Sequence, residues 1–231
     1  MRKGSSQFFV IEGLDGSGKS TQMELLRNYL QRHQHSYRDI HFPMLNQGRF
    51  GEMIARFLRG EFGGLNEVHP QLVALLFAAD RHEHADTLQK WISDGQILIA
   101  DRYVNSNIAF QCAKLDDPKE KIALREWILD MEYQYYKIPR PVVSLYLDVP
   151  FQAIARSLSQ QRDGADRDYL QGKADIHEAN LDFQEKVRQE YLEMVVTQED
   201  FHLITCADDQ GQFLPPEEIH GKILEFLQLK A

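Results

Sequence analysis

The apolar run Phe8-Phe9-Val10-Ile11 leads through Glu12 into Gly13-Leu14-Asp15-Gly16-Ser17-Gly18-Lys19-Ser20-Thr21. A glycine-rich run that ends in Gly-Lys-Ser, directly after an apolar strand, predicts a phosphate-binding loop that binds a nucleotide. Glycines let successive backbone N–H groups converge on phosphate oxygens at a helix N-terminus. Lys19 supplies a charge for the β- and γ-phosphates, and the Ser20 hydroxyl is placed to hold Mg²⁺. A glycine-rich turn capping an ordinary helix is the alternative, and the complete motif in this setting argues against it.

Length and composition indicate a compact enzyme. The chain has 231 residues, 43% of them hydrophobic, so we expect a single domain over residues 1–231. The formal net charge of −9 argues against binding to nucleic acid or to an anionic membrane, so a phosphate site must be a local basic pocket. No run of apolar residues is long enough for a membrane span or a signal-peptide core, which favours the cytoplasm. Cys112 and Cys206 lie far apart, as expected of reduced thiols rather than a disulfide or a zinc site.

Apolar runs and amphipathic segments alternate along the chain. The expected strands are Phe8–Glu12, Tyr37–Phe42, Ile97–Asp101, Val142–Leu147 and Phe201–Thr205. The expected helices lie near residues 19–33, 51–59, 70–93, 119–135, 151–160, 176–198 and 216–228. This alternation predicts an α/β fold in which helices cover both faces of a parallel sheet. In such sheets ligands bind at the carboxyl ends of the strands.

Two further stretches carry charged residues suited to phosphate chemistry. Asp101-Arg102 follows the third expected strand, where the acid can hold Mg²⁺ and the guanidinium can clamp a phosphate. An ordinary ion pair at a strand end is the alternative. Residues 161–174 are polar and contain Arg162 and Arg167, which predicts a lid that closes over the transferred phosphoryl group. The alternative for this segment is a solvated loop with charges of both signs.

The residues after the second expected strand bear on the acceptor of the phosphoryl group. A hydroxyl acceptor usually needs a carboxylate, whereas a phosphate acceptor needs cations that offset repulsion. The run from His41 to Arg49 contains no acid, which favours a nucleoside monophosphate over a nucleoside. Glu12, at the end of the first strand, is the acid that could contradict this inference.

Taken together, these motifs resemble those of thymidylate kinases, which are P-loop nucleoside monophosphate kinases. The resemblance rests on Gly13–Thr21, Phe42-Pro43, Leu75–Arg81, Asp101-Arg102-Tyr103 with Ser106-Asn107, Tyr146-Leu147-Asp148 and the arginine-bearing lid. It implies a P-loop NTPase fold with a five-stranded parallel sheet, usually as a homodimer. It also implies transfer of the γ-phosphate of ATP to dTMP, with Mg²⁺, to give dTDP and ADP. A deoxynucleoside kinase or a kinase for another monophosphate is the alternative.

The resemblance also implies roles for individual residues. Phe77 would stack on thymine, Arg81 would reach a base carbonyl, and Phe42, Pro43, Ser106, Asn107 and Gln111 would complete the nucleoside pocket. Arg102 would hold the dTMP phosphate, Asp15 would fix that phosphate through the metal or an arginine, and Asp101 would support Mg²⁺. Some family members have a basic residue where this chain has Gly16. Its absence implies that Arg162 or Arg167 of the lid supplies the transition-state charge.

Two positions depart from the family pattern. Met44 and Leu45 follow Phe42-Pro43 where many relatives have an arginine, so Arg49 is the nearest candidate for a second phosphate clamp. Either Tyr169 or the segment Asp175–Glu178 matches the part of the lid that contacts the deoxyribose. A GTP-driven switch is disfavoured because the chain has no Asn-Lys-x-Asp sequence. An inactive nucleotide-binding protein would be expected to lack Lys19 or the arginines, and all are present.

Overall fold

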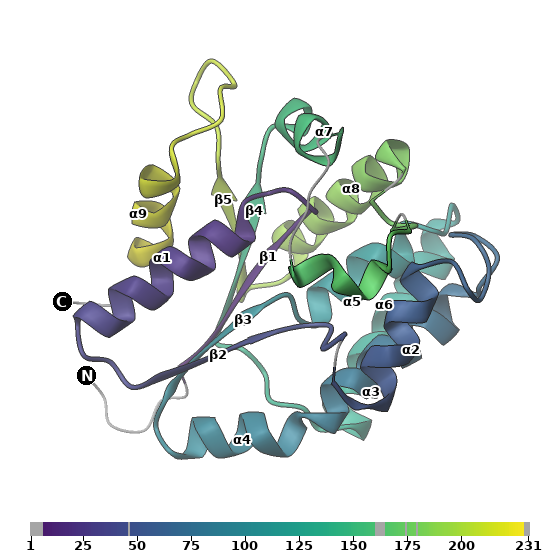
Figure 1. The fold of residues 1–231 in the computed structure, drawn as a ribbon, viewed down its shortest axis with the longest axis horizontal. Coiled ribbons are helices and arrows are strands. Elements are labelled where there is room, and N and C mark those ends of the chain that lie inside the picture. The colour runs from purple at the N-terminus through teal and green to yellow at the C-terminus, as the bar shows by residue number, and fades with distance from the viewer. Residues whose placement is uncertain (1–6, 46, 160–164, 174, 179, 229–231) are drawn as a thin grey trace.

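The computed structural model describes residues 7–45, 47–159, 165–173, 175–178 and 180–228. Its centre is a five-stranded parallel sheet (Figure 1). The strands are β1 (Phe8–Gly13), β2 (Tyr37–His41), β3 (Ile97–Asp101), β4 (Val143–Asp148) and β5 (Phe201–Thr205), in the order β2-β3-β1-β4-β5. All residues of β1 and β3 are buried, as expected of strands covered by helices on both faces. The predicted fold class and all five predicted strands are confirmed.

The register of the strands determines which residues meet at their carboxyl ends. Asp101 at the end of β3 pairs with Ile11 of β1 on one side and with His41 of β2 on the other. The phosphate-binding loop begins at the end of β1, one strand away from Asp101. The sheet thus brings the two predicted phosphate-binding sequences to one edge.

Helices cover the sheet in two layers. On one side, α1 (Lys19–Arg32) and α9 (Pro216–Leu227) pack together against the sheet (Figure 1). The other long helices are α2 (Gly48–Leu58), α3 (Pro70–Glu83), α4 (Ala85–Ser93), α5 (Val104–Cys112), α6 (Pro118–Asp130), α7 (Phe151–Ser159) and α8 (Leu181–Thr197). Of these, α5 is central, since it contacts β1, α3, α6 and α8. A π-helical turn, η1 (Met131–Tyr135), extends α6, and a 3₁₀ helix, η2 (Ala165–Leu170), lies in the predicted lid.

Three helix predictions differ from the structure. Helix α5 is not predicted from the sequence, because all nine of its residues are buried and its sequence therefore has no amphipathic period. The expected helix 70–93 is two helices that meet at His84. The expected helix 176–198 begins at Leu181, where the side chain of Asn180 accepts a hydrogen bond from the N–H of Phe183.

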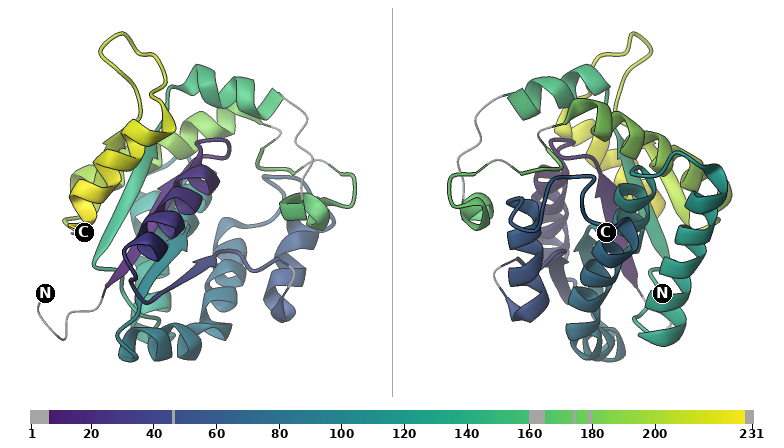
Figure 2. Two further views of the ribbon diagram at one scale, coloured as in Figure 1. Left: turned by 60° about the vertical axis from the view of Figure 1, so that its left-hand side comes forward. Right: turned by 90° about the vertical axis from the view of Figure 1, so that its right-hand side faces the viewer.

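The part of the predicted lid that the structure describes packs against α2. Figure 2 shows η2 beside this helix. Ile54, Phe57 and Leu58 of α2 form a small buried cluster with Val73 of α3, and Tyr169 of η2 packs on it. Packing on an apolar cluster gives this segment a defined position, whereas the sequence suggested only a polar connection.

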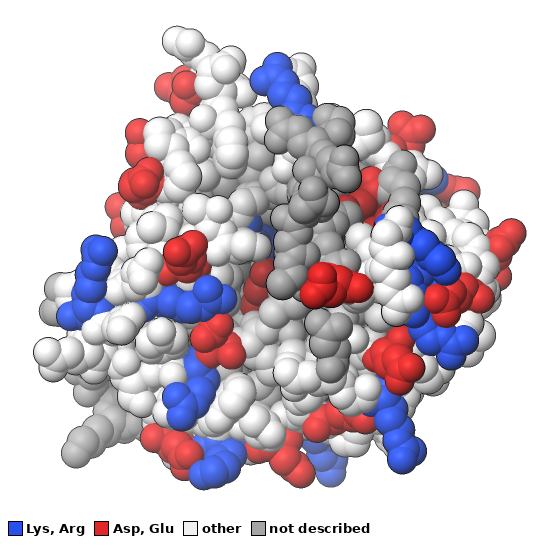
Figure 3. Space-filling view, viewed as in Figure 1, with Lys and Arg blue, Asp and Glu red and all other residues white. Residues whose placement is uncertain are grey.

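The charged surface and the two cysteines are as the composition predicts. Acidic and basic side chains are intermixed over the coloured part of the face in Figure 3. Cys112 and Cys206 are both buried and free of disulfides. Among the described residues, no helix is long and apolar enough to cross a membrane.

Candidate active site

A cavity of about 700 Å³ opens at the carboxyl ends of β1, β2 and β3. The predicted residues that line it are Asp15, Gly16, Gly18, Lys19, Ser20, Phe42, Pro43, Phe77, Arg81, Asp101, Arg102, Ser106, Asn107, Gln111 and Tyr169. Arg49 is exposed on α2 and is not among the lining residues. Gly13, Leu14, Ser17 and Thr21 belong to the loop but do not line the cavity either. Arg162 lies outside the described residues, and for Arg167 only the backbone, in η2, is described.

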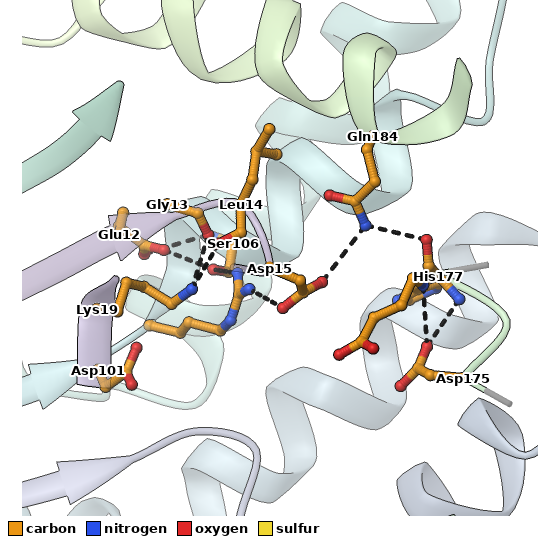
Figure 4. Close-up of polar contacts among 12 residues, drawn as sticks. Glu12, Gly13, Leu14, Asp15, Lys19, Asp101, Ser106, Asp175, His177 and Gln184 are labelled. Atoms are coloured by element: carbon orange, nitrogen blue, oxygen red, sulfur yellow. Dashed lines mark hydrogen bonds and ion pairs between the residues drawn. The ribbon is translucent and has the colours of Figure 1, made fainter. Parts of the chain in front are cut away.

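The phosphate-binding loop holds its lysine against its own backbone. Nζ of Lys19 donates hydrogen bonds to the carbonyl oxygens of Gly13 (3.2 Å) and Leu14 (2.8 Å), as Figure 4 shows. Burial, followed by repulsion from Arg102, lowers the pKa of Lys19 to about 8. Gly18 adopts a φ of +81° at the start of α1, in the left-handed region that favours glycine. The buried cation and the N-terminus of α1 together make this loop suited to a phosphate anion.

Arg102 is held in one orientation by three elements. Its backbone has a φ of +66°, which is uncommon for a non-glycine residue and is often found at functional sites. Nη2 donates to Oδ1 of Asp15 in the phosphate-binding loop (2.6 Å), and Nη1 donates to the hydroxyls of Ser106 on α5 (3.0 Å) and Tyr191 on α8 (3.5 Å). The guanidinium is therefore preorganised beside the loop.

Asp15 and Arg102 keep each other ionised. Burial disfavours the charged forms of Asp15 and Arg102. Nearby Arg102 and Lys19 nevertheless lower the pKa of Asp15 to about 2. The carboxylate of Asp15 in turn raises the pKa of Arg102. Arg102 therefore remains a cation that can bind a phosphate at any physiological pH.

Asp101 and Ser20 provide oxygen atoms suited to Mg²⁺. One oxygen of Asp101, Oδ2, lies 3.2 Å from Nδ1 of His41. The other, Oδ1, is buried and has no hydrogen-bond partner among the described residues. Burial opposes ionisation of Asp101, but the hydrogen bond from His41 and the charge of Lys19 lower its pKa. A carboxylate oxygen and a hydroxyl in one cavity fit Mg²⁺, which prefers oxygen ligands and keeps several waters.

Glu12 has a structural role that the sequence did not reveal. It is fully buried and does not line the cavity. Its Oε1 accepts the backbone N–H groups of Tyr103 (2.9 Å) and Ser106 (3.2 Å) at the start of α5, and its Oε2 accepts the hydroxyls of Ser106 and Tyr191. These bonds satisfy orphan donors at the helix N-terminus. The acid that could have served a nucleoside hydroxyl is thus directed into the core.

Tyr169 of the lid and the segment Asp175–Glu178, which the sequence left as alternatives, lie side by side and are hydrogen-bonded. The hydroxyl of Tyr169 donates to Oδ2 of Asp175 (2.7 Å), and Oδ1 of Asp175 accepts the N–H of His177 (2.7 Å). Nε2 of Gln184 on α8 then bridges the carbonyl of His177 (2.9 Å) and Oδ2 of Asp15 (3.4 Å), as Figure 4 shows in part. A continuous chain of hydrogen bonds therefore links the lid to the phosphate-binding loop.

Asp175 should make stability depend on pH. Burial, followed by repulsion from Asp15, raises its pKa to about 7. The unfolded carboxyl titrates at about 4, so the folded protein binds more protons between about pH 4 and 7, and this carboxyl lowers stability as pH rises. The Asp175→Asn variant lacks this effect. Its unfolding free energy minus that of the natural chain should therefore be higher at pH 8 than at pH 5 by at least about 1 kcal/mol. Urea unfolding at both pH values measures it.

Asp116→Asn is the matched control, because its side chain is 92% exposed. It should show no such trend. A difference between the Asp175→Asn variant and the natural chain that stays constant with pH would contradict the assignment.

Several residues at the site were not found from the sequence. Gln184 and Tyr191 lie in an ordinary amphipathic helix, and nothing in their spacing marks them. His177 belongs to the segment Asp175–Glu178 that the sequence offered as an alternative to Tyr169, but its packing among Phe57, Phe110 and Phe183 of α2, α5 and α8 was not predicted. Glu132 is one of many acids in the expected helix 119–135, yet both of its oxygens bind Arg81. Each contact depends on tertiary structure, so a single sequence carries no local signal for it.

Comparisons with known proteins all indicate the same family. A family model described as thymidylate kinase matches residues 11–212. The probable thymidylate kinase of Thermococcus kodakarensis is 28% identical, and the match covers 96% of this chain and 97% of the relative. The thymidylate kinase of Bifidobacterium longum subsp. infantis is 31% identical over 90% of this chain and 82% of the relative.

A solved structure agrees at the level of the fold. The thymidylate kinase of Candida albicans superposes with a TM-score of 0.72 at 24% sequence identity, covering 96% of this chain and 91% of the other. The family match includes the phosphate-binding loop, the Asp101-Arg102 pair and the predicted lid. The chain therefore belongs to the thymidylate kinase family.

Proposed function

We propose that this protein transfers the γ-phosphate of ATP to dTMP, giving dTDP and ADP. The observation that carries the proposal is a single cavity that joins the phosphate-binding loop to a pocket containing Phe77 and Arg81, with Arg102 between the loop and α5. Such a cavity suits two nucleotides whose phosphates meet. Arg102, which Asp15 orients beside the loop, provides a clamp for a phosphate, and this favours a phosphate acceptor over a hydroxyl acceptor.

The phosphate-binding loop, Gly13–Thr21, would bind the phosphates of ATP. Its backbone N–H groups and Lys19 would contact them, and Lys19 would exchange its hydrogen bonds to Gly13 and Leu14 for phosphate oxygens. Ser20 and Asp101 would hold Mg²⁺. When bound, the ion offsets negative charge on the β- and γ-phosphates.

Arg102 would clamp the acceptor phosphate, held in position by Asp15. Arg162 or Arg167 would supply further positive charge to the transferred group when the lid closes. Arg49 as a second phosphate clamp would require the first turn of α2 to move, because this side chain does not line the cavity. The reaction would need no covalent enzyme intermediate and no general base, since charge neutralisation and alignment lower the barrier.

Assembly and location are part of the proposal. We propose a homodimer in the cytoplasm, on the basis of the family resemblance. Leu72 on α3 (63% exposed) and Met53 on α2 (42% exposed) are large apolar side chains on adjacent helices, as a contact between two copies would need.

The acceptor base tests the proposal. With ATP and Mg²⁺, ADP formation should be fastest with dTMP, slower with dUMP, and much slower with dCMP and dGMP, because Phe77 would stack on thymine and Arg81 would reach its carbonyl. A coupled assay for ADP measures all four acceptors in parallel. A clear preference for dCMP or dGMP would keep the phosphoryl transfer but reject the substrate, and would favour a kinase for another monophosphate.

A further inference from the structure

The π-helical turn η1 places a buried carboxylate behind the base pocket. Glu132 has no exposed surface, and its oxygens accept hydrogen bonds from Nε and Nη2 of Arg81. Its Oε1 also accepts Nδ2 of Asn107 at 3.0 Å. Burying a carboxylate costs free energy unless it is paired and hydrogen-bonded. Arg81 pairs with Glu132, and both Arg81 and Asn107 donate hydrogen bonds to it. Both of them line the cavity, whereas Glu132 does not.

The partners of Asn107 determine which end of its amide faces the cavity. Nδ2 donates to the carbonyl oxygen of Ala74 (3.0 Å) and to Glu132 (3.0 Å). A carbonyl and a carboxylate can only accept, so the nitrogen of the amide must face them. Oδ1 therefore points away from Glu132, and it is buried without a hydrogen-bond partner among the described residues. An unsatisfied buried acceptor favours a ligand that brings a donor.

Arg81 presents the opposite polarity at the same site. Glu132 binds the edge of the guanidinium formed by Nε and Nη2. The N–H groups of Nη1 and the second N–H of Nη2 have no hydrogen-bond partner in the described part of the chain, so they are available to a ligand. Its pairing with Glu132 also neutralises the buried charge, so a neutral base can lie beside it. The cavity thus offers a donor from Arg81 next to an acceptor from Asn107.

We propose that Glu132 is a positioning residue that sets the base selectivity of this enzyme, by orienting Asn107 as an acceptor and Arg81 as a donor. The pair matches a base with a ring N–H beside a carbonyl, as in thymine and uracil. It mismatches cytosine, whose ring nitrogen accepts and whose amino group donates. The inference rests on the proposed function, because it assumes that this pocket receives the base of the acceptor.

Two substitutions test the role of Glu132. Glu132→Gln replaces one acceptor oxygen with a donor, so Asn107 and Arg81 can no longer both be satisfied, and only the carbonyl of Ala74 is left to hold the amide of Asn107. We expect the ratio of kcat/KM for dTMP to that for dCMP to fall about tenfold or more, while KM for ATP changes less than about twofold. Glu132→Asp keeps the charge on a shorter side chain and should give an intermediate ratio.

Glu190→Gln is the matched control. Glu190 is 1% exposed and pairs with Lys121 (2.6 Å) and Arg125 (3.5 Å), and it does not line the cavity. Its loss should lower the melting temperature, as the loss of Glu132 should, without changing the ratio. If the control shifts the ratio equally, the effect is general destabilisation and the proposal is wrong.

The remaining outcomes separate the two claims. A folded Glu132→Gln variant whose ratio stays within about twofold of the natural chain overturns the role of Glu132 and leaves the proposed function intact. If this variant does not fold, Glu132→Asp decides in the same way: a several-fold fall supports the role and an unchanged ratio overturns it. A natural chain that does not phosphorylate dTMP overturns both the proposed function and the inference.

Discussion

Replacing Arg102 with alanine should lower kcat for dTMP phosphorylation on the order of 10³-fold or more, the range expected when an arginine that stabilises transferring phosphoryl charge is removed. The side chain is 10% exposed and is held by Asp15, Ser106 and Tyr191, so it is already oriented before substrate binds. Such preorganisation is worth most in the transition state, where negative charge is redistributed. Steady-state kinetics with dTMP and ATP measure the loss.

Two variants make this test specific. Arg102→Lys keeps the charge but cannot bind a phosphate with two parallel hydrogen bonds, so it should recover only part of the activity. Arg125→Ala removes an arginine that pairs with Glu190 and Glu193 outside the cavity, and it should leave kcat almost unchanged. If Arg102→Ala keeps near-normal kcat and KM, Arg102 is not the phosphate clamp.

Replacing Lys19 with methionine should lower kcat/KM for ATP by about 10² to 10³, because a preorganised charge at the β- and γ-phosphates is lost. Methionine keeps an unbranched chain of similar length, so packing changes little. The same substitution should not destabilise the protein. Burial lowers the pKa of Lys19 to about 8, so keeping this lysine charged in the folded protein costs free energy at every pH below that value.

Kinetics and thermal unfolding must therefore be measured together on the Lys19→Met variant. We expect a melting temperature at pH 7 equal to or above that of the natural chain, together with the loss of activity. Lys90→Met is the control, since its side chain is 72% exposed and pairs with Asp94 at the end of α4. A Lys19→Met variant that is fully active, or inactive only because it is unfolded, would contradict the role of Lys19.

Features encoded within short segments were predictable from the sequence. The loop Gly13–Thr21 and the runs that form β1 and β3 could be identified because glycine spacing and continuous apolar runs are local properties. That the loop lies close to Asp101 at the end of β3 was also predictable, because parallel strands bring their carboxyl ends to one edge of the sheet. The family resemblance then supplied the base-pocket residues Phe77 and Arg81, which local pattern alone did not distinguish from ordinary packing residues.

Features that depend on contacts between distant segments were not predictable. Helix α5 is buried on every side, so its sequence carries no period. The sequence leaves Glu12 open as an acid that could serve a hydroxyl acceptor. Its four hydrogen bonds to Tyr103, Ser106 and Tyr191 instead give it a structural role. Arg49 was placed near the phosphate from its distance to Phe42-Pro43 along the chain, but α2 begins there and presents this side chain to solvent. Distance along the chain does not determine the direction of a side chain.

The most direct test of the central claim follows the label from [γ-³²P]ATP with dTMP and thymidine as parallel acceptors. A phosphate acceptor should be phosphorylated because Arg102 and Lys19 offset its charge, and thymidine should be a poor acceptor because it brings no phosphate for Arg102 to hold. We predict label in dTDP from dTMP and almost none in dTMP from thymidine. Label transferred mainly to thymidine, or only to inorganic phosphate, would contradict the account.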